Sequence, residues 1–287
     1  MDRQGRSTGT ADGMEDVSQV RLSPDGRRFV VDRAERESGN GDLWVSDAAG
    51  NAARLTFDPA NDTFPIWSPD GRTIVWASNR DGTYQLYEKS ASGSGQDTVL
   101  LRSDLFKFPT DWSRDGRVIL YRQIDPKTRY DVWVLPLGPQ GPGKPYPFLQ
   151  SEANEAAAVL SPDGRWVAYS SDESDRYEVY VQSFPSGGGK RQVSVAGGNG
   201  PQWRSDGSEL FYQAPDGELM AAAVERGTSF AAGPPRPLFG FRPSGPLITP
   251  YFSVAPDGQH FLVSTIVDTA PGAPLSVVLN WTAAIDK

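Results

Sequence analysis

A six-residue motif that recurs along the chain constrains its fold more than any other feature. The clearest copy is Trp-Ser-Pro-Asp-Gly-Arg at residues 67–72, and an apolar run over 73–78 follows it. The aspartates of the six copies are Asp25, Asp70, Asp115, Asp163, Asp206 and Asp257, spaced 43 to 51 residues apart. A period in this range, with strand-like segments between the copies, predicts a β-propeller.

Each copy of the motif has the residues of a tight turn. Proline presets φ for the second position of a type I turn, aspartate tolerates the third, and glycine takes the positive φ that follows. A short loop of this kind, with glycine in the left-handed conformation, joins two antiparallel strands. We therefore expect each copy to connect the first and second strands of a blade.

The repeats predict one all-β domain over residues 1–287, a six-bladed β-propeller of four-stranded antiparallel blades. The blades are expected at 17–57, 63–101, 108–149, 156–195, 200–239 and 250–281. The last blade has only three strands, and residues 6–11 read as a spare strand that joins it, closes the ring and removes an exposed edge. The alternative is a seven-bladed ring in a longer parent protein. The Gly/Pro-rich stretch 138–147 reads as a long hairpin loop.

The middle strands of the repeats are nearly continuous apolar runs, which is typical of strands that are buried on both faces. Trp67, Trp112 and Trp203 occupy the same position in their repeats. We expect these rings to pack between blades rather than to stack on a ligand.

The charge and cysteine content exclude several classes of partner and chemistry. The chain has 36 Asp and Glu against 28 Lys and Arg, a net charge of −8, which disfavours nucleic acids and anionic membranes. It has no cysteine, so disulfides and thiolate chemistry are excluded. No apolar run approaches the roughly 20 residues of a membrane helix, and residues 1–11 carry no signal-peptide core. We expect a monomer that does not insert into a membrane.

The residue inventory does not predict a catalytic site. The single histidine, His260, lies within a predicted strand, and there is no Gly-x-Ser-x-Gly elbow. The Gly-Lys pair at 189–190 lacks the rest of a phosphate-binding loop. We therefore predict that the chain is not an enzyme and needs no cofactor. The alternative is a calcium-dependent hydrolase or lyase with a site in the central channel, for which the sequence names no ligands.

Topology indicates where a ligand would bind. In an up-and-down blade, the loops from second to third strands open on the same face as the loops that link successive blades. The candidate residues on these loops are Asp62, Phe64, Arg80, Asp81, Lys107, Arg129, Asn154, Glu155, Asp172 and Asn199. Both charge signs with an apolar ring suit a surface that binds a protein or peptide.

Several stretches resemble known propellers over essentially the whole chain. The hairpin motif, Ala-Ser-Asn-Arg-Asp-Gly at 77–82 and Leu-Thr-Phe-Asp-Pro at 55–59 resemble TolB-type six-bladed propellers. Residues 107–112, 236–239 and 277–283 resemble the C-terminal propeller of bacterial membrane-anchored serine/threonine kinases.

This resemblance implies a sensing or interaction module outside the cytoplasm, attached to a membrane-anchored parent, with no catalytic residues of its own. The kinase domain and membrane helix of that family are not in this sequence, which indicates a fragment or a shortened product. The gating propeller of a serine peptidase is a further alternative that fits the repeats but not the ending.

Overall fold

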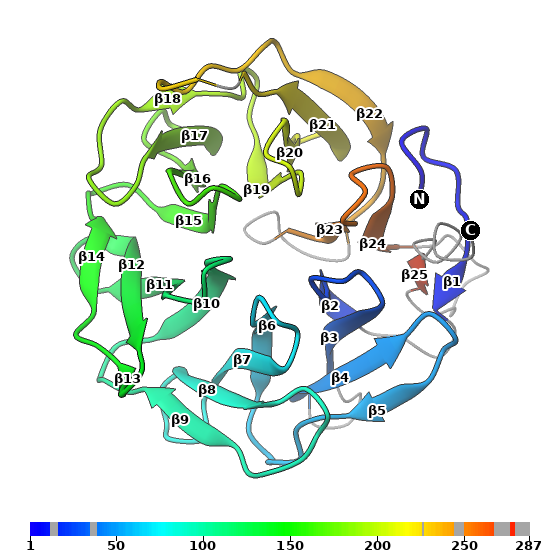
Figure 1. The fold of residues 1–287 in the computed structure, drawn as a ribbon, viewed down its shortest axis with the longest axis vertical. Coiled ribbons are helices and arrows are strands. Elements are labelled where there is room, and N and C mark those ends of the chain that lie inside the picture. The colour runs from blue at the N-terminus through cyan, green and yellow to red at the C-terminus, as the bar shows by residue number, and fades with distance from the viewer. Residues whose placement is uncertain (12–16, 35–38, 226, 244–249, 267–275, 279–287) are drawn as a thin grey trace. The chain divides into compact units, whose positions relative to one another are not determined.

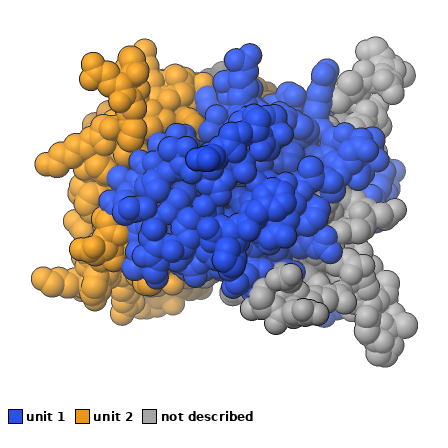
Figure 2. All heavy atoms as spheres, turned by 90° about the horizontal axis from the view of Figure 1, so that it is seen from below, with its two compact units in different colours: residues 1–102, 241–246, 251–287 blue, residues 103–240, 247–250 orange. Residues whose placement is uncertain are grey.

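The computed structural model describes residues 1–11, 17–34, 39–225, 227–243, 250–266 and 276–278. The chain divides into two compact units (Figure 2). Unit 1 comprises residues 1–102, 241–246 and 251–287, and unit 2 comprises residues 103–240 and 247–250. Within the described residues, each unit contains three antiparallel β-sheets.

Unit 1 contains sheets 1, 2 and 6 (Figure 1). Sheet 1 is formed by β2 (Val17–Leu22), β3 (Arg28–Ala34), β4 (Gly41–Asp47) and β5 (Ala52–Arg54). Sheet 2 is formed by β6 (Asp62–Trp67), β7 (Thr73–Ser78), β8 (Gln85–Ser90) and β9 (Thr98–Leu101). Sheet 6 is formed, in spatial order, by β23 (Phe252–Val254), β24 (Phe261–Thr265), β25 (Ser276–Val278) and β1 (Thr10–Ala11).

Unit 2 contains sheets 3, 4 and 5. Sheet 3 is formed by β10 (Lys107–Trp112), β11 (Val118–Asp125), β12 (Arg129–Gly138), β13 (Gly141–Pro142) and β14 (Tyr146–Leu149). Sheet 4 is formed by β15 (Glu155–Leu160), β16 (Trp166–Ser171), β17 (Glu178–Ser183) and β18 (Arg191–Gln192). Sheet 5 is formed by β19 (Asn199–Trp203), β20 (Glu209–Gln213), β21 (Glu218–Ala223) and β22 (Arg236–Gly240).

These are the four-stranded antiparallel blades of an all-β propeller, with one exception in sheet 3. The stretch 138–147, which we expected to be a loop, includes the short strand β13, which pairs back onto β12 and gives this sheet a fifth strand. Gly141 permits the reversal because its φ is 101°. The closure of six blades into one ring and the single domain over 1–287 stay predictions.

The N-terminal strand joins the last sheet, but it is shorter than predicted. Thr10 pairs with Val278 and Ala11 with Val277 (Figure 1), so β1 covers two residues rather than 6–11. Residues 2–6, before β1, form a turn in which the Asp2 carboxylate accepts hydrogen bonds from the backbone amides of Gln4 at 2.9 Å and Arg6 at 3.0 Å. The predicted strand over 275–281 and the resemblance at 277–283 continue into residues outside those described.

The hairpin prediction is confirmed at every copy of the motif. The six motif glycines have φ between 63° and 75°. In sheet 2, the Gly71 amide donates to the Ser68 carbonyl at 2.9 Å, and the Ser68 hydroxyl donates to Asp70 at 2.6 Å. The bonds from Ser68 and from the Arg72 amide lower the pKa of Asp70. The turn is therefore stabilised by contacts within six residues.

Within each unit, the core lies between neighbouring sheets. In unit 1, Leu43 of sheet 1 packs with Ile74 and Trp76 of sheet 2. In unit 2, Val179 of sheet 4 packs with Leu210 of sheet 5. All five side chains are fully buried, as the apolar middle strands predicted.

Two of the three repeated tryptophans link neighbouring sheets. The Trp67 indole donates to the Arg21 carbonyl at 3.0 Å, and the Trp203 indole donates to the Val159 carbonyl at 3.3 Å. Trp112 is half-buried and donates to Gly116 of its own hairpin. No helix long and apolar enough to cross a membrane occurs in the described part of the chain.

Candidate functional site

The predicted ligand-binding residues lie at one end of their sheets. We call this the loop end: there the second strand turns into the third, and there the chain enters the first strand. The hairpins of the repeated motif lie at the opposite end of each sheet.

Four of the ten predicted residues are buried rather than exposed on loops. They are the first residues of first strands: Asp62 of β6, Lys107 of β10, Glu155 of β15 and Asn199 of β19. Each is at most 5% exposed. Three of them pair with the last residue of the second strand, and Lys107 pairs with Gln123, the third residue from the end of β11. These side chains therefore face the protein interior, and their contacts decide how their charges are met.

The first strands also carry a β-bulge that bends their backbone. In β6 the register shifts between Thr63 and Ile66, and in β15 it shifts between Ala156 and Val159. Phe64 and Ala157, inside these bulges, have φ of 56° and 51°, which is left-handed backbone at non-glycine residues. Predicted residue Phe64 is thus a half-buried bulge residue.

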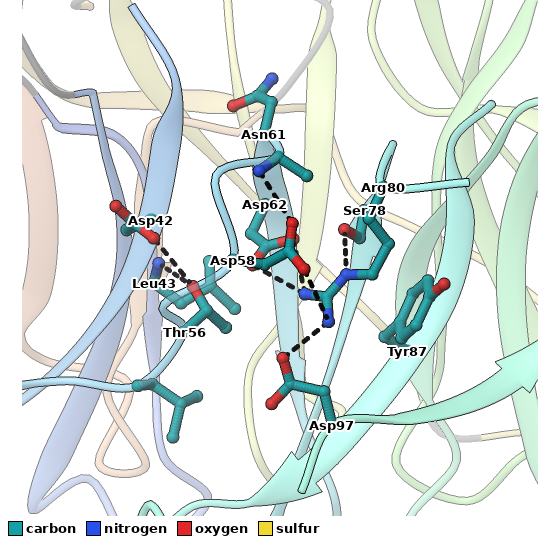
Figure 3. Close-up of polar contacts among 12 residues, drawn as sticks. Asp42, Leu43, Thr56, Asp58, Asn61, Asp62, Ser78, Arg80, Tyr87 and Asp97 are labelled. Atoms are coloured by element: carbon teal, nitrogen blue, oxygen red, sulfur yellow. Dashed lines mark hydrogen bonds and ion pairs between the residues drawn. The ribbon is translucent and has the colours of Figure 1, made fainter. Parts of the chain in front are cut away.

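In sheet 2, polar side chains form a network that we call the Asp62 cluster: Asn61, Asp62, Asn79, Arg80 and Asp97. Figure 3 labels its members other than Asn79. The Arg80 guanidinium lies 3.2 Å from the Asp62 carboxylate and donates to Asp97 at 2.8 Å. The backbone amide of Asn61 donates a hydrogen bond to Asn79 Oδ1 at 2.8 Å. The cluster therefore ties the linking segment before β6 to the turn after β7.

Further contacts hold Arg80 in place. Its Nε donates to Ser78 at 2.9 Å, and its guanidinium lies 4.4 Å from the centre of the Tyr87 ring (Figure 3). Burial raises the pKa of Asp62, although Ser78 and Arg80 act to lower it. Burial lowers the pKa of Arg80, but Asp97 and Asp62 outweigh it and the net pKa is raised. The buried acid is thus met by a cation of the same sheet.

Predicted residue Asp81 belongs to a separate, exposed contact. Its carboxylate accepts hydrogen bonds from Tyr87 and from Arg102, the latter at 2.5 Å. These bonds lower its pKa, with Tyr87 the largest cause.

In sheet 4, the Glu155 cluster comprises Asn154, Glu155, Asp172, Glu173 and Lys190. The Asp172 carboxylate accepts hydrogen bonds from the backbone amide of Asn154 at 2.7 Å and from the side-chain Nδ2 of Asn154 at 2.6 Å. Lys190 donates to both oxygens of Glu173 at 2.7 Å. The structure thus brings the predicted residues Asn154 and Asp172 into direct contact, beside Glu155.

Carboxylates surround Glu155. Burial raises its pKa to about 7; a hydrogen bond from Ser151 opposes this, and the carboxylates of Asp131, Glu173 and Asp172 add to it. Burial also raises the pKa of Asp131. Glu155 Oε2 has no hydrogen-bond partner among the described residues.

The two clusters occupy the same positions in their repeats, and the charges of one ion pair are exchanged between them. Counted from the hairpin aspartates Asp70 and Asp163, Arg80 corresponds to Glu173 and Asp97 to Lys190. The partners are 17 residues apart in both pairs. Lys190 lies 5.4 Å from the Tyr180 ring, as Arg80 lies over Tyr87. In sheet 4 the cation, Lys190, therefore lies just before the fourth strand, β18. The acid Glu173 takes the position that Arg80 has in sheet 2.

The remaining predicted residues of unit 2 have contacts of their own. Lys107 donates to Ser103 and to the Leu105 carbonyl, and burial lowers its pKa to about 8, against the effect of Asp104. Asn199 Oδ1 accepts from the Gly200 amide at 2.7 Å. Arg129 is exposed, with φ of 71° at the first residue of β12.

Sequence reasoning missed a buried arginine near these residues. The Arg122 guanidinium lies 4.8 Å from the ring centres of both Phe108 and Tyr130, and burial lowers its pKa. Arg122 lies opposite Phe108 in the sheet, and this pairing could have been found from the expected strands.

The single histidine lies away from the loop ends. His260 is in the hairpin of sheet 6, where its Nδ1 lies 2.6 Å from the Asp257 carboxylate. Within the described ranges, no group of three or more histidines and carboxylates is arranged to hold a metal ion.

Comparisons with known proteins bear on the fold. Residues 6–135 match the family model described as TolB beta propeller domain. The chain is 28% identical to the uncharacterized peptidase YuxL of Bacillus subtilis over 58% of its length, but the match spans about a third (32%) of that peptidase.

Two solved structures share the fold. TolB from Acinetobacter baumannii superposes with a TM-score of 0.66 at 16% identity, over 96% of this chain and 65% of that one. An oligogalacturonate lyase in complex with manganese superposes with a TM-score of 0.62 at 14% identity, over 97% of this chain and 95% of the lyase. The chain therefore has a TolB-like β-propeller fold, which these comparisons connect with proteins of different activities.

Proposed function

We propose that this chain is a non-catalytic binding module that takes a protein or peptide at the loop ends of its blades. The observation that supports it most is the position of exposed apolar side chains within their sheets. Of the six exposed large hydrophobic residues in the described ranges, four lie at loop ends: Phe57, Phe106, Val195 and Ile266. Three of these are on segments that link one sheet to the next, where binding residues are commonly found.

Contacts from neighbouring arginines support this proposal because they hold two of these apolar residues or their backbone in place. Phe57 is 67% exposed, and the Arg54 guanidinium lies 5.2 Å from its ring. Val195 is 73% exposed and occupies the corresponding position at the end of sheet 4. The Arg176 side chain donates to its carbonyl at 3.3 Å. A prearranged surface loses less entropy when a partner binds.

Peptide selection tests the proposal. A displayed random-peptide library is selected on the chain, and the peptides are then measured against a triple variant with Phe57, Phe106 and Val195 changed to serine. The control changes two exposed outer-strand residues, Val99 and Tyr146, to serine. We expect at least tenfold weaker binding by the loop-end variant only. Equal binding to both variants would contradict the proposal.

An assay for catalysis separates this function from the alternative. The manganese-bound lyase has a similar fold, so oligogalacturonides with Mn²⁺ or Ca²⁺ are the substrates to test. Formation of an unsaturated product by the wild-type chain would replace the binding module with a metal-dependent enzyme.

We also propose that the module works in the bacterial periplasm, as part of a membrane-anchored signalling protein. The TolB-like fold and the resemblance of residues 107–112 and 236–239 to kinase propellers support this. Osmotic-shock fractionation, with an antibody to the chain, tests the compartment; recovery with cytoplasmic markers would contradict it.

A further inference from the structure

The Glu155 cluster contains a buried acid that forms no ion pair with a cation among the described residues. Glu155 is 4% exposed, and its Oε2 has no hydrogen-bond partner among the described residues. Three further acids, Asp131, Glu173 and Asp172, add to the rise in the pKa of Glu155. An isolated carboxylate in the interior is unfavourable, so such a group either stays protonated or takes a cation.

The corresponding place in sheet 2 shows which kind of group fits. There the Arg80 guanidinium reaches Asp62 from the turn after the second strand. In sheet 4 this turn position holds Glu173, whose carboxylate is directed to Lys190. The backbone frame is the same in both, since Asn154 and Asp172 repeat the contact of Asn61 and Asn79.

From this exchange we propose that the Glu155 cluster receives a guanidinium or ammonium group of a bound peptide, in the place that Arg80 takes beside Asp62. The inference rests on the proposed function and specifies it: the peptide presents an arginine or lysine side chain. A charge-assisted hydrogen bond to Glu155 Oε2 would satisfy the atom that has no partner within the chain.

The proposal predicts that binding is linked to the loss of a proton. Glu155 is largely protonated below pH 7, and a cation is attracted to its carboxylate form. Binding should therefore tighten as the pH rises from 5.5 to 8, while the guanidinium of the peptide stays charged throughout. Asp131, Asp172 and Glu173 are the acids that face the site, and Ser151 donates to Glu155.

The experiment uses acetyl-Gly-Arg-Gly-amide as the probe and the neutral citrulline peptide as its matched control. Binding is followed by NMR chemical shifts at pH 5.5 and 8 for the wild-type chain, Glu155→Gln and Glu152→Gln. Glu152 is exposed and precedes the same strand. We expect the arginine peptide to bind wild type and Glu152→Gln alike, and to bind Glu155→Gln at least tenfold more weakly. The citrulline peptide should also bind at least tenfold more weakly.

Three results would overturn the proposal. The first is equal binding of the arginine and citrulline peptides, and the second is undiminished binding to Glu155→Gln. The third is binding of Ca²⁺ or Mn²⁺ alone that depends on Glu155 while the arginine peptide does not bind. A second variant, Glu173→Arg, supplies the cation from within the chain. It should weaken binding of the arginine peptide by a similar factor to Glu155→Gln. Loss of this site with retained binding of the selected peptides at Phe57, Phe106 and Val195 would leave the proposed function intact.

Discussion

The Asp62 cluster of sheet 2 and the Glu155 cluster of sheet 4 have the same backbone contact, but the charges of one ion pair are exchanged between them. Both bury an acid at the start of a first strand, and in both the preceding amide is bonded by the turn after the second strand. Sheet 2 provides Arg80 to its acid, whereas sheet 4 places Glu173 at that position and pairs it with Lys190. A repeated backbone thus holds one site that is complete within the chain and one that has an unsatisfied oxygen.

The largest effect is expected when the complete cluster loses its cation. Arg80→Met should lower the free energy of unfolding by about 3–5 kcal/mol, because Asp62 would stay buried without a cation beside it. Urea unfolding measures this. The control is Arg102→Met, since Arg102 is exposed and contacts the exposed Asp81, and little change is expected there. A loss no greater than that of the control would show that Arg80 does not stabilise Asp62.

The incomplete cluster should respond in the opposite direction. The folded pKa of Glu155, about 7, lies above its ordinary value of 4.5, so its ionisation destabilises the fold as the pH rises through this interval. Glu155→Gln should therefore raise stability by about 2 kcal/mol at pH 8, with solvent screening allowed for, and change it little at pH 4.5. Unfolding at the two pH values, with Glu152→Gln as control, measures it; equal effects at both would be contrary to this prediction.

The exchange of charges itself can be reversed. The double variant Glu173→Arg with Lys190→Asp gives sheet 4 the residues that sheet 2 has at Arg80 and Asp97. We expect a gain of about 1 kcal/mol at pH 8 and a weaker dependence of stability on pH, since Glu155 then has a cation beside it. Changing both residues to glutamine removes the pair without adding that cation. If the glutamine variant behaves like the exchanged one, the arginine is not what acts on Glu155.

The smallest effect is expected for the contact that both clusters share, which joins Asn61 to Asn79 in sheet 2 and Asn154 to Asp172 in sheet 4. Asp172→Asn converts the sheet 4 contact into that of Asn79 with Asn61, and should change stability by less than about 0.5 kcal/mol. Asp172→Ala removes the acceptor of the Asn154 amide and should cost about 1 kcal/mol. Thermal unfolding of both variants distinguishes the two; equal losses would mean that the frame depends on the charge of Asp172.

The sequence predicted the features of the fold that depend on near neighbours. The six hairpins were located because Ser68, Asp70 and Gly71, and their counterparts, make their bonds inside the turn. The burial of Asp62 and Glu155 was not predicted, because it depends on side chains that other strands bring to them. We expected loops there, and the structure has strands.

The charge exchange had a signal in the sequence that was not used. Arg80 and Glu173 follow their hairpin aspartates by ten residues, and Asp97 and Lys190 follow them by 27. Alignment of the repeats on Asp70 and Asp163 would have paired them. It would not have shown that Glu155 Oε2 lacks a partner, since that depends on where the third and fourth strands place their side chains.

The pairing of β1 with β25 affects the order in which the sheets can form during synthesis. Sheets 1 to 5 are each built from one continuous segment, so each can form soon after its own residues leave the ribosome. Sheet 6 joins β1, which precedes sheets 1 to 5 in the sequence, to β25, which follows them, and among the described sheets this strand pairing spans the most residues. Its completion must therefore wait until synthesis of residues 276–278, and β1 has no strand partner from its own sheet until then.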